Sequence, residues 1–212
     1  TLEHTLAVNS VRPGAGGSYL ALNGCTNWGG HTFVSIPSSS CSSEATGIMG
    51  GVAGLIVSEA RDRGVHLTTD EIYQLVRSTA DDVDFATPNA VDPANDLLSG
   101  STVRYPTSPG WDATTGFGRL NAYELIKAVR DGRVPPEADL TSPQWFSVLP
   151  AKGSVDVRGR IAAPRASHYS YRVEWTTGLQ PPASPGADQW HVIASAAHRT
   201  RTQDGHLATL DL

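Results

Sequence analysis

The sequence predicts two domains of different class, an α/β domain over residues 1–132 and a small β-sandwich-like domain over residues 137–212. In the first part, strand-like and helix-like hydrophobic patterns alternate, whereas the second part has short patterns with a period of two. The adjacent Pro135 and Pro136 lie between them. Because neither can continue a helix or donate to a sheet, residues 133–136 are the expected linker. The last strand pattern runs to the final residue, so an incomplete sandwich is a further expectation.

The first domain is expected to open with short strands at residues 6–8, 19–22 and 32–36, the last of them stopping at Pro37. Residues 38–43 are expected to form a polar loop. A helix then runs to Glu59, because aliphatic residues and a methionine recur at helical spacing, at Ile48, Met49, Val52, Leu55 and Ile56.

Glycines are unusually frequent in this helix, at Gly47, Gly50, Gly51 and Gly54. Each one costs up to about 1 kcal/mol relative to alanine in a helix interior. We therefore expect either a neighbour that packs very close to the helix or a ligand that approaches its first turn.

Two further helices have recognisable N-termini. Thr68 and Glu71 form a capping-box pattern, and the helix that follows is expected to end near Ala80. Asn121 is the expected N-cap of a third helix, and residues 81–110 are expected to be irregular.

The second domain has strand patterns at residues 154–161, 169–175, 190–194 and 207–212. Large aromatic residues share one face of the second of these strands, at Tyr169, Tyr171 and Trp175. We expect these rings to form part of the sandwich core, and a sugar-stacking platform is the alternative.

Composition excludes two classes of partner. The net charge is −5 and the 16 Lys and Arg residues are scattered, so no basic patch for nucleic acid is expected. No apolar run approaches the ~20 residues of a membrane span. The start has no signal-peptide pattern, which suggests a mature or trimmed piece of a longer protein.

Only two lysines occur, Lys127 and Lys152, while Ser, Thr and Gly are frequent. This composition favours a secreted or extracellular protein.

The chain contains two cysteines, Cys25 and Cys41, which are too few for a structural zinc site. The even count and the composition of an exported protein favour a disulfide between them. Such a bond closes a loop of about fifteen residues and would stabilise the fold by roughly 3 kcal/mol. Two free thiols of a cytosolic protein are the alternative.

Ser42 and Ser43 stand at the start of the glycine-rich helix. Backbone N–H groups are unpaired at a helix N-terminus and the helix dipole is positive there, so a developing oxyanion would be stabilised. A nucleophilic serine is therefore one interpretation of this position, and a simple N-cap is the other.

The segment from Ser43 to Ser58 resembles the nucleophile region of subtilisin-like serine peptidases, in which Gly-Thr-Ser-x-Ala-x-Pro leads into a buried helix. Residues 67–80 are similar to the helix that follows in that family. Residues 116–122 are similar to its closing Gly-Tyr-Gly-x-Val-Asn/Asp-Ala signature. The resemblance covers roughly residues 1–131 and implies the C-terminal half of a subtilisin-like parallel-sheet domain. It also implies a serine endopeptidase that cleaves polypeptides through an acyl-enzyme on Ser43.

Thr46 is the competing nucleophile, because aligning it also matches Val-Ala-Gly of the family with residues 52–54. That alignment puts Glu44 where the family has glycine, so we prefer Ser43 and give Ser42 the supporting Thr position. Three departures from the family pattern remain, namely Cys41 for glycine, Gly47 for proline and the charged Glu44.

In the family, the catalytic Asp, the His and the oxyanion Asn precede the strand that begins here at Leu6. The resemblance therefore implies that this chain lacks them, is inactive alone, and has the N-terminal part of the same peptidase domain as its partner. The alternative is a pseudopeptidase, or a binding or adhesion module that keeps the fold. His31 is expected in an exposed turn, and the later histidines are expected at the surface, namely His66, His168, His191, His198 and His206.

No cofactor is expected. The acidic run Asp81, Asp82 and Asp84, with Asp92 and Asp96, offers oxygen ligands for a structural calcium ion. Since the run lacks alternate-residue ligand spacing around a central glycine, we expect a solvated loop.

Overall fold

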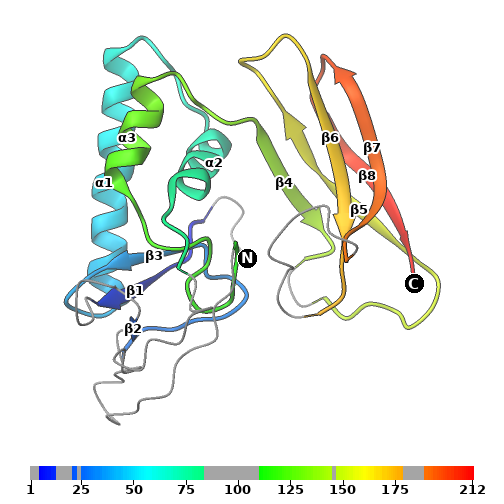
Figure 1. The fold of residues 1–212 in the computed structure, drawn as a ribbon, viewed down its shortest axis with the longest axis horizontal. Coiled ribbons are helices and arrows are strands. Elements are labelled where there is room, and N and C mark those ends of the chain that lie inside the picture. Colours follow the sequence, from blue (N-terminus) through cyan, green and yellow to red (C-terminus); the bar gives the residue numbers. More distant parts are fainter. Residues whose placement is uncertain (1–4, 13–20, 23–24, 84–109, 145–146, 179–188) are drawn as a thin grey trace. The chain divides into compact units, whose positions relative to one another are not determined.

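The computed structural model of the protein describes residues 5–12, 21–22, 25–83, 110–144, 147–178 and 189–212. The chain divides into two compact units, Thr1–Arg133 and Val134–Leu212 (Figure 1). The described part of the first unit combines three helices with a small sheet, whereas that of the second contains strands and no helix. The chain therefore has mixed α and β structure, as the alternating patterns predict.

The first unit has a three-stranded sheet in the order β2 (Ala21–Leu22), β1 (Val8–Arg12), β3 (Val34–Pro37). β1 is parallel to β3 and antiparallel to β2. The first strand begins at Val8 and not at Leu6, because Val8 is the first residue that pairs with β3. Of the strand expected at residues 19–22, the first two residues lie outside the described part.

Residues 116–120 run along the other side of β3 through backbone hydrogen bonds to Phe33 and Ser35. Gly116 and Gly118 have φ of 66° and 109°, where side chains are disfavoured. A Cβ on Gly116 would overlap the Phe33 backbone, and one on Gly118 would overlap that of Asp81. Both glycines are thus required by the close approach of the backbones on either side.

Helix α1 spans Ser42–Asp62, so it begins inside the expected polar loop and ends three residues later than predicted. Its buried face contains Ala45, Met49, Ile56 and Ala60, at the spacing of one helix side. This face packs on β1, β3 and α3. In the described part of the first unit, α1 is the helix that contacts the sheet most extensively.

The opposite side of α1 contains the glycines. The sequence predicts a close-packed neighbour or a ligand here, and the described chain supplies no such neighbour. A Cβ placed on Gly47, Gly50, Gly51 or Gly54 meets no atom within 4 Å among the described residues. Two aliphatic neighbours on this side, Ile48 and Leu55, are also exposed. We call this surface the glycine face; its residues are Gly47, Ile48, Gly50, Gly51, Gly54 and Leu55.

Both predicted caps are confirmed. Helix α2 (Thr69–Thr79) begins with a complete capping box, in which Thr68 accepts from the Glu71 N–H and the Glu71 carboxylate accepts from the Thr68 N–H. Helix α3 (Ala122–Arg130) begins at Asn121, whose side chain accepts from the Glu124 N–H. α3 contacts both other helices.

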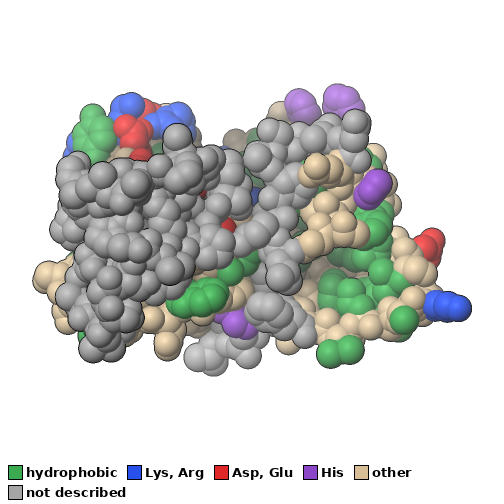
Figure 2. Space-filling model, turned by 60° about the horizontal axis from the view of Figure 1, so that its bottom comes forward, with side chains coloured by type: hydrophobic (Ala, Val, Ile, Leu, Met, Phe, Trp, Pro, Cys, Tyr) green, Lys and Arg blue, Asp and Glu red, His purple; other side chains and the backbone are tan. Residues whose placement is uncertain are grey.

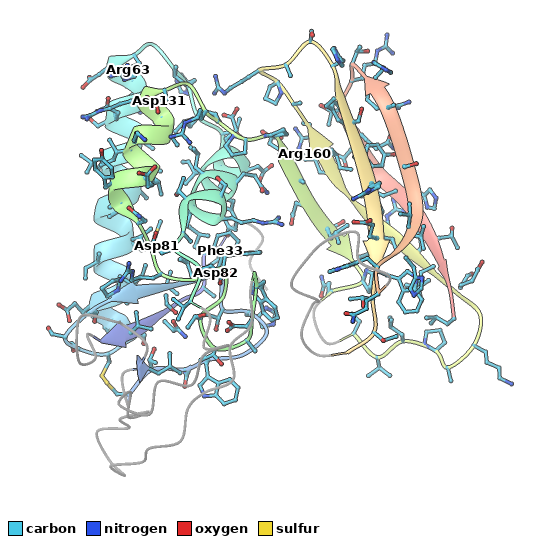
Figure 3. All side chains as sticks on the ribbon, viewed as in Figure 1. Phe33, Arg63, Asp81, Asp82, Asp131 and Arg160 are labelled. Atoms are coloured by element: carbon cyan, nitrogen blue, oxygen red, sulfur yellow. A yellow bond between two sulfur atoms is a disulfide. The ribbon has the colours of Figure 1, made fainter. Side chains whose placement is uncertain are left out.

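An ion cluster joins the C-terminal ends of α1 and α3. The Glu59 carboxylate contacts Arg63 at 2.9 Å and Arg130 at 3.0 Å. Hydrogen bonds from Arg130 and then Arg63 lower the pKa of Glu59 to about 2. Figure 3 shows Arg63 and Asp131 at these two helix ends.

The second unit contains a sheet in the order β4 (Glu137–Ser142), β5 (Ser154–Ala162), β8 (Gln203–Asp211) and a pair of strands, β6 (Tyr169–Trp175) and β7 (His191–Arg199). All pairings are antiparallel. The core draws side chains from both sheets, namely Val157, Ile161, Val173, Leu207, Ala208 and Leu210.

The aromatic residues of β6 pack partly buried against this core, so their interpretation as core residues is confirmed. β4 is not among the strands predicted from the sequence. Its Leu140 is 59% exposed, so the strand has little hydrophobic pattern of its own and depends on pairing with β5.

Candidate functional site

The candidate site is the N-terminus of α1 and the loop that leads into it. Cys41 is the N-cap residue, and its side chain makes no capping hydrogen bond. It forms a disulfide with Cys25, with a Cα–Cα distance of 5.2 Å, which confirms the predicted pairing and excludes two free thiols (Figure 3). Cys41 has φ of −71° in extended backbone, a conformation open to any residue. The cysteine therefore causes no backbone strain where the peptidase pattern has glycine.

Ser43 is the second residue of α1, and its side chain is exposed. Within the described residues, its hydroxyl and its N–H make no hydrogen bond. The first hydrogen bond at this helix end is the one from the Glu44 N–H to the Cys41 carbonyl, at 3.1 Å. A hydroxyl and an N–H of the same residue are thus both available at the positive end of a long helix.

The competing hydroxyls are in different positions. Thr46 Oγ1 donates to the Ser42 carbonyl at 2.8 Å, one helical turn earlier. This hydroxyl is bound to its own helix backbone, as threonine side chains commonly are. Ser42 is half-buried.

Glu44 reaches back from the first turn of α1 to the preceding loop. One carboxylate oxygen, Oε2, accepts from the Ser40 N–H at 2.7 Å and from the Ser38 hydroxyl at 3.1 Å. The Ser39 hydroxyl lies 3.3 Å from the same oxygen and 3.4 Å from Oε1. The carboxylate thus binds three consecutive serines.

The same loop is bound to β1 on its other side. The buried Ser10 hydroxyl lies 2.8 Å from the Ser40 carbonyl and 3.0 Å from the Ser38 hydroxyl. The Ser38 N–H donates to the Val11 carbonyl at 2.9 Å. The loop is therefore fixed between a buried strand and the helix that it precedes.

From the sequence alone, Glu44 is only a departure from the peptidase pattern, and these contacts are not predicted. The available signal was an acidic residue at the third position of a helix, which commonly reaches back to a backbone N–H before the helix. Here the Glu44 carboxylate accepts from the N–H of Ser40, which is the residue before the N-cap residue Cys41.

Two of the acidic residues considered for calcium have other partners. Asp81 accepts from Arg119 at 2.6 Å and from Asn121 at 2.8 Å. Partial burial raises the pKa of Asp81, but these hydrogen bonds outweigh it and the net pKa is lowered. Asp82 accepts from the Gly110 N–H at 2.7 Å. Figure 3 shows Asp81 and Asp82 next to each other beside Phe33.

The remaining acidic candidates, Asp84, Asp92 and Asp96, lie outside the described residues. Within the part of the chain that is described, no three His, Cys, Asp or Glu side chains are grouped to hold a metal ion.

The histidines in the described part of the chain are at the surface, as predicted. The six in the described segments are all exposed, and several are visible in Figure 2; they are His31, His66, His168, His191, His198 and His206. None of these six forms a hydrogen bond with Ser43. The described chain does not bring a histidine base to the candidate nucleophile.

None of the helices in the described segments has both the length and the apolarity that crossing a membrane requires. Comparison with models of known protein families, with curated proteins and with solved structures finds no match in any of the three sets.

Proposed function

We propose that this chain is the C-terminal part of the catalytic domain of a subtilisin-like serine endopeptidase, followed by a β-sandwich-like domain. The observation that carries the proposal is the environment of Ser43, whose exposed hydroxyl and N–H lie together at the N-terminus of α1. This is the arrangement that an acyl-transfer nucleophile and its oxyanion donor need.

The proposed reaction is peptide-bond hydrolysis in two steps. Ser43 Oγ attacks the scissile carbonyl carbon while a histidine takes its proton, and the Ser43 N–H donates to the developing oxyanion. The C–N bond then breaks, the amine leaves with the proton, and water hydrolyses the resulting ester. The histidine, its orienting aspartate and a side-chain oxyanion donor come from outside these residues, so the chain alone is inactive.

The glycine face supports the proposal that the N-terminal part of the same peptidase domain packs against α1. Four glycines on one side of a helix lower its stability, because glycine has a low helix propensity. Two aliphatic side chains on the same side are exposed to water. Glycines are useful where another backbone approaches closely.

Disulfides persist in oxidising compartments, and this chain contains one. We therefore propose that the protein is secreted or extracellular. The proposed substrate is a polypeptide, and no cofactor is required for this chemistry.

The second candidate is a pseudopeptidase or a binding or adhesion module that retains the fold. One observation favours it: the Glu44 carboxylate lies in the first turn of α1, where its negative charge opposes an oxyanion at the same helix end.

The complete polypeptide that carries these residues should react with a fluorophosphonate probe, which labels activated serines. We expect Ser43→Ala to abolish labelling and Thr46→Val to leave it measurable. Labelling that survives Ser43→Ala would refute the assignment of the nucleophile.

Residues 1–212 alone are the matched control, and they should not be labelled because the proposed base comes from outside them. Absence of labelling in the complete wild-type polypeptide would favour the binding module.

A further inference from the structure

The candidate nucleophile follows a loop in which both backbone polar groups of Ser40 have a partner. The Ser40 N–H donates to Glu44, and the Ser40 carbonyl accepts from the Ser10 hydroxyl. The next residue, Cys41, is covalently bound to Cys25. Ser43 is therefore three residues beyond a peptide unit that is held on both sides.

The number of hydrogens that these groups can donate shows why an acceptor suits this position. Each serine hydroxyl has one hydrogen to donate. Ser10 uses it on the Ser40 carbonyl, at 2.8 Å. The Ser40 N–H lies 2.7 Å from Glu44 Oε2 and 3.2 Å from the Ser38 hydroxyl oxygen, so the carboxylate is its nearer acceptor. The Ser38 hydroxyl lies 2.8 Å from the Ser40 carbonyl and 3.1 Å from the Glu44 carboxylate, so its one hydrogen can go to either acceptor. The Ser40 N–H and the Ser38 and Ser39 hydroxyls lie within hydrogen-bond distance of Glu44, and a carboxylate, which only accepts, can accept from all three.

From this network we infer that Glu44 is a positioning residue for Ser43: it holds the Ser38–Ser40 loop against the start of α1 and so sets where the Ser43 hydroxyl and N–H lie. The inference rests on the proposed peptidase function. It gives a role to the residue that follows the nucleophile, in a chain that has cysteine where the peptidase pattern has a flexible glycine.

The conservative variant is Glu44→Gln. The glutamine carbonyl oxygen can accept the Ser40 N–H and the Ser38 hydroxyl, which are the two shortest contacts, but the charge is lost. Glu44→Ala removes every acceptor. Asp62→Ala is the matched control, because it removes one carboxylate from the exposed C-terminal end of the same helix.

The experiment measures fluorophosphonate labelling of the complete polypeptide over a range of probe concentrations. We expect Glu44→Ala to lower the first-order rate constant about 10- to 100-fold, as misplaced reacting groups do, with little change in probe affinity. Glu44→Gln should recover most of that rate, and Asp62→Ala should match the wild type.

A double-mutant cycle identifies the path of the effect. Ser38→Ala removes one donor of the same network, so its effect should largely disappear in the Glu44→Ala background. Additive effects would contradict an action of Glu44 through this loop.

Hydrogen exchange of the Ser40 N–H provides a readout that is independent of activity, and it should be faster in Glu44→Ala than in Glu44→Gln. Equal labelling of the wild type and Glu44→Ala would overturn the inference and leave the proposed function intact. Faster labelling of Glu44→Ala than of the wild type would overturn the inference as well. It would mean that the main effect of the Glu44 charge is to destabilise the oxyanion. No labelling of the wild type would overturn both.

Discussion

The two sides of α1 differ in a way that the rest of the structure does not explain. One side buries Ala45, Met49, Ile56 and Ala60 against the sheet and α3. The other side, the glycine face, has no described neighbour within 4 Å of any glycine Cβ position. The exposed side of this 21-residue helix has no charged residue between Ala45 and Ser58, and the proposed partner surface would cover it.

The largest expected difference between the two sides is in stability. Ile56 is fully buried and Leu55 is 51% exposed. Ile56→Ala should reduce the free energy of unfolding by about 2–5 kcal/mol, through lost burial and the cavity left behind. Leu55→Ala should change it by no more than about 0.5 kcal/mol in residues 1–212 alone. Urea unfolding measures both, and equal losses would contradict the contrast.

The disulfide is expected to have the next largest effect. It closes a loop with a sequence separation of 16 residues and holds the N-cap of α1. Replacing both cysteines by serine should lower the free energy of unfolding by roughly 3 kcal/mol. A reducing agent should destabilise the wild type to a similar extent and leave the double variant unchanged. Equal sensitivity of the two proteins to the reductant would contradict this expectation.

The glycine face gives a prediction of opposite sign. Because a Cβ at Gly50 meets open space, Gly50→Ala should stabilise residues 1–212 by up to about 1 kcal/mol through helix propensity. In the complete polypeptide the same change should destabilise, if the proposed partner packs there. Gly118→Ala is the contrasting variant, since its Cβ would overlap the Asp81 backbone, and it should destabilise in both cases.

The smallest effect concerns the ion cluster at the C-terminal end of α1. The pKa of Glu59 is lowered from 4.5 to about 2, chiefly by hydrogen bonds from Arg130 and Arg63. A lowered carboxyl pKa contributes stability that is present above pH 4.5 and is lost as the pH falls towards 2. Glu59→Gln should therefore make the melting temperature less dependent on pH in that range. Because both arginines of the cluster are exposed, high salt should reduce the difference, and a salt-independent difference would contradict this explanation.

Local side-chain chemistry explains which parts of the fold were predictable. The caps at Thr68 and Asn121 depend on residues three positions apart, so the sequence alone reveals them. β4 was not predicted because it has no strand pattern in its own sequence. It is held by hydrogen bonds to β5, which lies about twenty residues further along the chain. For the same reason, β1 and β3 begin two residues later than predicted, and β1 ends four residues later, at Arg12.

The candidate site was predictable in part. The Cys25–Cys41 bond was predicted from the cysteine count and the composition and is confirmed, whereas Ser43 was chosen through the resemblance to subtilisin-like peptidases. The contacts of Glu44 were not predicted, because they depend on the path of the Ser38–Ser40 loop. The environment of the glycine face was predicted to be crowded, and in the described chain it is open. Sequence shows that these glycines need an explanation, but it does not identify the surface that would supply it.

The most direct test of the proposed peptidase is to find the residue that carries the adduct after fluorophosphonate treatment. The complete polypeptide is labelled, digested and analysed by tandem mass spectrometry of the peptide that contains residues 42–46. We predict a phosphonyl adduct on Ser43, since its hydroxyl is exposed and makes no hydrogen bond within the described chain. An adduct on Ser42 or Thr46, or a labelled protein whose Ser43 is unmodified, would contradict the assignment.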